Sequence, residues 1–283
     1  MNIQNQIITI NNDKLKSEMC FFQYEKTEKS MLLRNLFTLI SRERDKKTEK
    51  VLRDLGYEII EFNKCFGYIN LSIVEDVSNG QVELKKGDLV LTQACLKKYS
   101  NLLIEKDHCK NEIIKYVIKS EEVQANMLLL PFLYTAIRIY YKYDIEYEEK
   151  FLLVGDSLVM KLLKIVVNEY MYSLRHIRDI SQEMMSQRYL EEAVFYIETQ
   201  MVSLEEADYL KQKNITVYDS GCINFELKNC NDRELRSEAE RLLSSRSLNL
   251  NEFIGYHVHP ENLEMILGSL KNRRDNRMLV LDW

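Results

Sequence analysis

Cysteine and histidine are the residues of this chain whose side chains could bind a metal ion or form a disulfide. The six cysteines never form a C-x-x-C pair, and the two nearest ones, Cys222 and Cys230, are separated by seven residues. The histidines offer two metal-like pairings, His108-Cys109 and His257-x-His259, and neither has a second ligand pair at the spacing of a zinc motif. In a cytosolic chain such cysteines are reduced and behave as small buried hydrophobic residues. The pattern therefore predicts no metal site.

Charge and hydropathy limit the partners of the chain. It has 39 basic and 44 acidic side chains over 283 residues, a net charge of −5 and a pI near 5.6. Nucleic-acid binding needs a basic surface, so we expect no nucleic-acid partner. No apolar run reaches about 18 residues, and the N-terminus lacks the basic and apolar regions of a signal peptide. We expect a cytoplasmic protein without a membrane partner, folded as about two domains.

Glycine and proline are scarce. The chain has 8 glycines and 2 prolines, where average usage would give about 20 and about 14. A fold that needs glycine at several positions of positive φ or close approach has few glycines to place there.

The first half of the sequence reads mainly as short strands. β-rich stretches are predicted over residues 7–10, 20–24, 31–40, 68–74 and 88–92. Ser78-Asn79-Gly80 and Lys85-Lys86-Gly87-Asp88 have turn composition. A charged helix is predicted over residues 42–55. Many short strands with turns between them favour a β-barrel-like or sandwich-like unit.

From about residue 120 the pattern changes to strands that alternate with helices. A helix interrupted at Pro131 is predicted over residues 121–143, and the alternating segments follow it. The strands are predicted at 151–155, 173–177, 193–197 and 215–218, and the helices at 157–170, 182–190, 204–211 and 232–244. This alternation predicts parallel βαβ units. The chain then closes with a strand at 253–258, a helix at 260–270 and a strand at 278–283.

Several segments, in a fixed order, carry a resemblance to a known family. They are residues 33–41, Gly67-Tyr68, the Lys-Gly-Asp turn within 82–90, residues 131–136, Leu248-Asn249-Leu250 and residues 260–283. Together they resemble the medium-chain dehydrogenase/reductase superfamily, the relatives of zinc alcohol dehydrogenase and quinone reductase, and within it the bi-domain oxidoreductase branch. The resemblance implies an α/β fold with two domains. A GroES-like β-rich domain would cover residues 1–120, completed by 251–283, and a shortened Rossmann-like domain with a parallel sheet would cover 121–250.

The same resemblance implies a nicotinamide cofactor bound at a glycine-rich corner. The G-x-G-x-x-G pattern lets pyrophosphate meet backbone N–H groups at a helix N-terminus. The matching positions run from Gly155 to Met160, and only the first glycine is present. Ser157 puts a side chain where the backbone should approach the phosphates, Met160 is bulky where the helix packs on the strand, and Asp156 adds a carboxylate near the phosphate charges. These departures predict that NAD(P) is not bound in the usual pose.

One acidic residue favours NAD binding instead. Asp179, 24 residues after Gly155, fits the residue that accepts the ribose hydroxyls in NAD-binding members. Its alternative is a helix N-cap at a strand end, a position that favours aspartate in any case. Arg175 and Arg178 could contact the 2′-phosphate of NADP. The alternative is that they are solvated surface charges.

Zinc chemistry looks absent from the matched positions. The family's zinc enzymes use a cysteine after the strand that ends near Ser41 and a His-Glu pair near Gly67. This chain has Ser41 there, and Tyr68 and Ile69 in place of the pair. Zinc-free relatives protonate their substrates through Tyr, Ser or bound water, so Tyr68 and Ser41 are the candidate proton-relay residues. The alternative for Tyr68 is packing at a core edge.

Two functions remain open at this point. The first is a degenerate, zinc-free dehydrogenase-like protein without normal NAD(P) binding. It would act as a binding, scaffold or accessory subunit in a specialised biosynthetic pathway, with a small metabolite or a biosynthetic protein as its partner. The alternative is an active zinc-independent NAD(P)(H)-dependent oxidoreductase on a small or specialised metabolite. The joint loss of glycines and zinc ligands favours the first, and family analogy implies a homodimer formed through the nucleotide domains.

Overall fold

The structure is a computed structural model, and the description below covers the following residues: 1–11, 14–27, 30–40, 69–78, 84–93, 97–103, 113–116, 124–142, 151–154, 158–170, 174–177, 194–197, 217–219, 232–244, 252–270 and 278–283. The chain divides into two compact units. Unit 1 contains Met1–Leu128, Leu227–Asn229 and Asn249–Trp283, and unit 2 contains Leu129–Glu226 and Cys230–Leu248.

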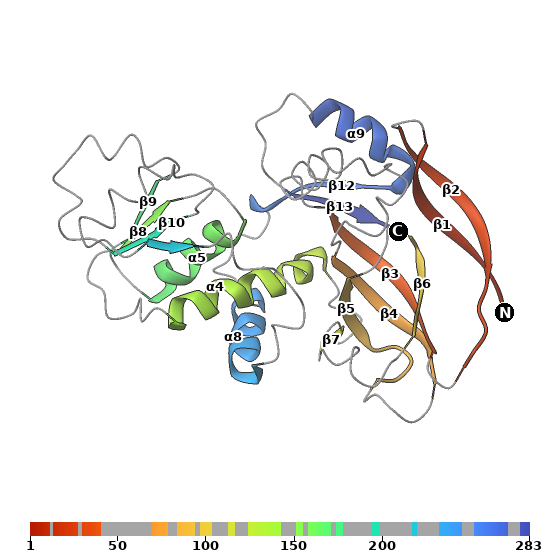
Figure 1. Ribbon diagram of the computed structural model, residues 1–283, viewed down its shortest axis with the longest axis horizontal. Helices are drawn as coiled ribbons and strands as arrows, with labels where there is room; N and C mark the ends of the chain where they lie inside the picture. Colours follow the sequence, from red (N-terminus) through yellow and green to blue (C-terminus); the bar gives the residue numbers. More distant parts are fainter. Residues whose placement is uncertain are drawn as a thin grey trace. The chain divides into compact units, whose positions relative to one another are not determined.

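Unit 1 begins with a long β-hairpin, drawn in red in Figure 1. Strands β1 (Asn2–Asn11) and β2 (Lys14–Gln23) pair antiparallel over their whole length, from Asn2 opposite Gln23 to Asn11 opposite Lys14. The sequence pattern predicted only residues 7–10 and 20–24 as strand. The flanking residues are mostly polar, and they are extended because each one has a partner across the ladder, a stabilisation that no local pattern records.

The main sheet of unit 1 is built around β3 and has the order β12-β13-β3-β4-β5-β7, with β6 also paired to β3. Its strands are β3 (Ser30–Ile40), β4 (Ile69–Val77), β5 (Leu89–Gln93), β6 (Tyr99–Leu103), β7 (Ile113–Tyr116), β12 (Ile254–Val258) and β13 (Met278–Asp282). One edge of β3 pairs with β4. The other edge pairs first with β6, over residues 30–34, and then with β13, over residues 37–40. The C-terminal strand therefore returns to the β-rich unit, as predicted.

The turn before β5 is the one place where a described glycine has a positive φ. Gly87 has φ +91°, a conformation that other residues rarely adopt. Its N–H donates to the carbonyl of Val74 at 2.8 Å, and the Lys85 N–H donates to the Asp88 carboxylate at 2.8 Å. The Lys-Gly-Asp turn predicted from composition is confirmed.

Apolar clusters lie at several places in unit 1. One contains Met31, Leu33, Val74 and Val90. Another lies beneath the turn η9 (Pro260–Asn262) and helix α9 (Leu263–Leu270), and it contains Ile8, Ile40, Val258, Leu263, Leu279 and Leu281. Helix α9 and η9 both contact β2, so the hairpin is held at this end by apolar packing.

Unit 2 contains a four-stranded parallel sheet with the order β11-β10-β8-β9. Its strands are β8 (Phe151–Val154), β9 (Leu174–Ile177), β10 (Val194–Ile197) and β11 (Val217–Asp219). The described helices of the unit are α4 (Leu130–Lys142), α5 (Leu158–Tyr170) and α8 (Arg233–Ser244). Strands that follow one another in parallel, with helix α5 between the first two, confirm the predicted βαβ pattern.

Helix α4 is buried on nearly every side and packs against α5 and α8. The sequence pattern predicted a helix over 121–143 with an interruption at Pro131. Instead, a 3-10 helix, η3 (Ala125–Leu129), comes first, and the α-helix begins at Leu130 with Pro131 in its first turn. Proline is tolerated there because a first-turn N–H has no partner within the helix. Pro131 thus starts the helix rather than interrupting it.

Three predicted helices, over residues 42–55, 182–190 and 204–211, lie outside the described residues. Among the helices that are described, none has the length and apolar character needed to cross a membrane.

Candidate functional site

The strand order of unit 2 reverses between β8 and β10. From β8 the chain goes to β9 on one side, and the next strand, β10, pairs with the opposite edge of β8. Because the two strands are parallel and Val154 lies opposite Ile197, their carboxyl ends lie side by side. In open parallel sheets ligands bind in the crevice outside such a reversal point. We take this end of β8 and β10 as the candidate functional site.

Helix α5 follows β8 after three residues, Gly155, Asp156 and Ser157. These three residues are the predicted cofactor-binding corner, and they lie outside the described residues. The flanking elements have the order that a phosphate site requires, a strand end followed by a helix N-terminus. Helix α5 has no acidic residue in its first turn.

Met160 is the described residue that tests the fit of a dinucleotide to this corner. It lies in the first turn of α5, and its exposed fraction is 0%. It occupies the position of the third glycine in G-x-G-x-x-G, where the absence of a side chain lets the helix pack closely on the strand. A buried methionine at this position places a side chain where the pattern has none, so the helix cannot pack as closely on the strand. The structure thus places a large, buried side chain at the position where the pattern has its third glycine.

Asp179 comes two residues after the end of β9 at Ile177. It lies beyond the described part of the chain, and so does Arg178. Its predicted contact with a ribose hydroxyl remains a prediction. What the structure gives is the place of β9 next to β8, which is where the family pattern would put a ribose-binding residue.

The two predicted proton-relay residues flank described strands of unit 1. Ser41 follows Ile40 at the end of β3, and Tyr68 precedes Ile69 at the start of β4. Both lie outside the described residues, but Leu39 and Ile69 are cross-strand partners, so the strand ends that carry them are adjacent. Ile69 itself is buried in the sheet. Position 69 is one of the two that the sequence resemblance matches to the His-Glu pair, and that match remains a prediction.

A row of buried polar side chains lies next to these strand ends, and sequence reasoning missed it. Thr38, Asn70 and Thr92 are successive cross-strand partners on β3, β4 and β5, so their side chains share one face. Thr38 Oγ1 donates to Asn70 Oδ1 at 2.5 Å and accepts the Trp283 indole N–H at 2.6 Å. The only sequence signal was the interruption of apolar strands by single polar residues.

A second polar pair continues this row along β3 and β4. Ser72 Oγ donates to Asn35 Oδ1 at 2.5 Å, and Asn35 Nδ2 donates to the Lys97 carbonyl at 2.6 Å. Two further hydroxyls in the described interior, those of Thr92 and Ser100, are fully buried and have no hydrogen-bond partner. Buried hydroxyls of this kind are usually satisfied by an ordered water.

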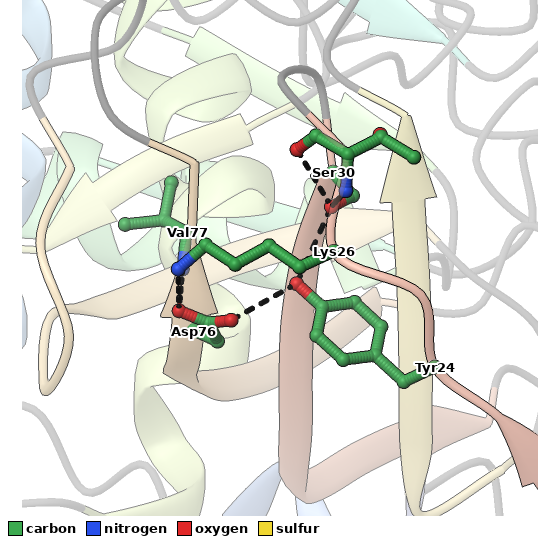
Figure 2. A network of polar contacts seen from close by, with 6 residues as sticks. Tyr24, Lys26, Ser30, Asp76 and Val77 are labelled. Carbon is green, nitrogen blue, oxygen red and sulfur yellow. Dashed lines mark hydrogen bonds and ion pairs between the residues drawn. The ribbon is translucent and has the colours of Figure 1, made fainter. Parts of the chain in front are cut away.

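An ionic network fastens the segment after β2 to the end of β4. Figure 2 shows Lys26 and Tyr24 reaching the carboxylate of Asp76, at 2.6 Å from Lys26 Nζ and 3.3 Å from the Tyr24 hydroxyl. The Tyr24 hydroxyl also lies 3.4 Å from Ser30 Oγ. The hydrogen bond from Lys26 lowers the pKa of Asp76, and the same bond raises the pKa of Lys26. Every partner here is accounted for within the fold, so this network positions the hairpin.

His257 and Asp282 form a pair on the neighbouring strands β12 and β13, with 3.0 Å between Nδ1 and Oδ1. The His257 ring also makes an edge-to-face contact with Phe37. Within the described ranges, no three residues of the types His, Cys, Asp and Glu are grouped so that they could hold a metal ion. The pair therefore has no third ligand among these residues.

Comparison with known proteins gives matches of structure only. No family model and no curated protein sequence matches the chain. Among solved structures, a quinone oxidoreductase from Coxiella burnetii matches with a TM-score of 0.61 at 11% identity, with all of both chains covered. Galactitol-1-phosphate dehydrogenase from Escherichia coli matches at 0.65 and 9% identity, with 99% of this chain and 100% of that chain covered. TarJ of S. aureus in complex with NADPH matches at 0.65 and 12% identity, with 99% of each chain covered.

These matches extend over the whole chain, and the matched proteins include quinone oxidoreductases and dehydrogenases. The chain therefore has the two-domain α/β fold of the medium-chain dehydrogenases/reductases. This confirms the predicted resemblance at the level of fold, and it confirms the predicted fold class.

Proposed function

We propose that this chain is a dehydrogenase-like protein that does not bind NAD(P) in the usual pose and serves as a binding or accessory subunit in a biosynthetic pathway. The observation that carries the proposal is the burial of Met160 in the first turn of α5. The third-glycine position exists to let helix and strand approach each other. With a methionine there, the helix N-terminus and the strand end do not come together around a diphosphate.

Two further features support the proposal. Ser157 replaces the glycine that lets bare backbone approach the phosphates. Ile69 is buried where the zinc enzymes of the family have a metal-binding pair. Cofactor and metal positions belong to different parts of the chain, so their joint loss fits relaxed selection on catalysis better than a change of substrate.

The test is a calorimetric titration of the full chain with NADH and with NADPH up to millimolar concentration. We expect no saturable heat with either dinucleotide. The double variant Ser157→Gly/Met160→Ala restores a glycine and a small residue at the two altered positions, and it should gain binding. Val159→Gly is the matched control, since it adds a glycine to the same turn outside the pattern.

Stability must be measured alongside, because truncating a buried methionine to alanine costs about 2–5 kcal/mol. Thermal unfolding of each variant shows whether it is folded before it is titrated. The wild-type titration stands on its own: a micromolar dissociation constant for either dinucleotide would overturn the proposal.

The second candidate is an active, zinc-independent NAD(P)(H)-dependent oxidoreductase on a small metabolite. The observation that favours it is the reversal point at β8 and β10, which is placed as in a functional nucleotide domain. Two of the matched structures, TarJ and a quinone oxidoreductase from Escherichia coli, are complexes with NADPH. Under this reading Tyr68 and Ser41 would relay the proton, and Tyr68→Phe would abolish a reductase activity that dinucleotide binding had first revealed.

A further inference from the structure

The outer edge of the N-terminal hairpin is unpaired in the described part of the chain. Strand β2 pairs with β1 and with no other described strand. Met1 and Tyr24 exchange both backbone hydrogen bonds, each at 2.8 Å. Because hydrogen-bonded pairs alternate along an antiparallel ladder, the even-numbered residues of β2 bond to β1. Ser17, Met19, Phe21 and Gln23 therefore direct their N–H and C=O groups to the open edge.

The opposite edge of the hairpin supports this assignment. On β1 the alternation leaves the even-numbered residues facing away from β2. The carbonyl of Gln6 indeed accepts the N–H of Lys98 at 2.8 Å, on the side of the main sheet. The hairpin thus uses one edge to join unit 1, and no described strand pairs with its other edge.

Two large apolar side chains are exposed along this free edge. Met19 has an exposed fraction of 57% and Phe21 of 75%. Their cross-strand partners on β1 are Gln6 and Gln4, so no apolar neighbour on β1 covers them. Soluble proteins protect long edge strands with charges, prolines or bulges. The stretch from Met19 to Phe22 has none of these devices.

We propose that a second copy of this chain pairs antiparallel with β2 along this edge, with a two-fold axis through Cys20. Met19 of each copy then lies opposite Phe21 of the other, and Ser17 opposite Gln23. Ser17, Met19, Phe21 and Gln23 of each copy each gain a hydrogen-bonded partner, and the two hairpins become one four-stranded sheet. A two-fold contact needs only one self-complementary patch, and this segment provides it.

The charges of β2 agree with this register. Opposite residues of like charge destabilise a strand pair. With the axis at Cys20, Glu18 lies opposite the partner's Phe22 and Lys16 opposite the partner's Tyr24, so no like charges meet between residues 16 and 24. An axis two residues earlier would place Glu18 against the partner's Glu18, and Met19 would lie opposite the partner's Ser17 instead of an apolar residue.

This dimer is independent of the proposed function and differs from the one that family analogy implies, which would use the nucleotide domains. The first experiment is sedimentation velocity of the full chain over a micromolar concentration series. We expect a reversible dimer. Phe21→Lys and Met19→Lys should each weaken it about tenfold or more, whereas Met265→Lys, at an equally exposed apolar residue of α9 (66%), should leave it unchanged.

A second experiment tests the register. Residues in a non-hydrogen-bonded antiparallel pair have Cα atoms about 4.5 Å apart, which lies within the range of a disulfide. Mild oxidation of the dimer should therefore link Cys20 to the Cys20 of the second copy, identified by mass spectrometry of the linked peptides. A monomeric wild type, a dimer that survives Phe21→Lys, or a dimer without the Cys20 link would each overturn the proposal.

Discussion

The buried hydroxyls of the β-rich unit are of two kinds, those with a hydrogen-bond partner in the protein and those without one. The hydroxyl of Thr38 bridges Asn70 and Trp283, whereas the hydroxyl of Thr92, one strand further along the same row, has no partner. A hydrogen bond adds little net stability, but leaving its buried partners unpaired is costly. We therefore expect the two threonines to respond differently to replacement by valine.

The first prediction compares the two corresponding valine variants. Thr38→Val should lower the free energy of unfolding by about 1–3 kcal/mol, because it leaves the Trp283 indole N–H without its acceptor. Thr92→Val keeps the shape, removes an unpaired hydroxyl, and should be neutral or stabilising by up to about 1 kcal/mol. Urea denaturation of both variants measures the difference. A loss of similar size in both would mean that an ordered water satisfies Thr92.

The second prediction concerns Gly87 in the turn before β5. Its φ of +91° is one that alanine adopts only with strain, although no atom lies within 4 Å of an added Cβ. Gly87→Ala should therefore cost about 1–2 kcal/mol from backbone strain alone. Lys86→Ala at the neighbouring exposed position should change stability by less than about 0.5 kcal/mol. Equal effects in the two variants would contradict the assignment of strain to position 87.

At the scale of elements, the segments with a strong local pattern were predicted well. The apolar run at 151–154 and the helical spacing after 158 depend only on neighbouring residues, and both elements form where predicted. The full length of β1 and β2 and the strands β6 and β7 were missed. These segments are polar or short, and they are extended because of partners that are distant in the sequence.

Part of the candidate site could likewise be predicted from the local sequence, and part of it could not. The order of strand, corner and helix around residue 155 could be predicted, because it follows from the chain itself. The buried row of Thr38, Asn70 and Thr92 could not be predicted, because it requires the register of three strands. The closing contact from Trp283 lies 245 residues away from Thr38 in the sequence, and no local pattern contains it.

The third prediction concerns the anchor between the hairpin and β4. The pKa of Asp76 is lowered in the folded chain, chiefly by its hydrogen bond from Lys26. The ionised carboxylate of Asp76 therefore stabilises the fold at pH values above its pKa in the unfolded chain, about 3.9. This contribution is lost as the pH falls through the lower pKa of the folded chain. Asp76→Asn should thus be less stable than wild type at pH 7, and the gap should narrow below about pH 4.

Urea denaturation at neutral and at acid pH measures this gap. Lys26→Met removes the same hydrogen bond from the other side and should show the same narrowing. If the difference in the free energy of unfolding between wild type and variant is the same at both pH values, the charge of the Asp76 carboxylate does not stabilise the fold.

At the scale of the whole molecule, the chain shares its fold with oxidoreductases to which it is only about 10% identical in sequence. The matches cover the full chain at 9–12% identity for the three structures compared. A two-domain fold survives such divergence because apolar periodicity and chain order specify it. A cofactor corner tolerates less substitution than the fold, because it needs particular small residues at particular positions.

We propose that side chains at the corner between β8 and α5 exclude a dinucleotide. A crystal structure of the full chain grown with millimolar NADPH tests it most directly. We expect no dinucleotide across the carboxyl ends of β8 and β10, with Met160 of α5 still buried. Density for a pyrophosphate lying against residues 155–157 would contradict it.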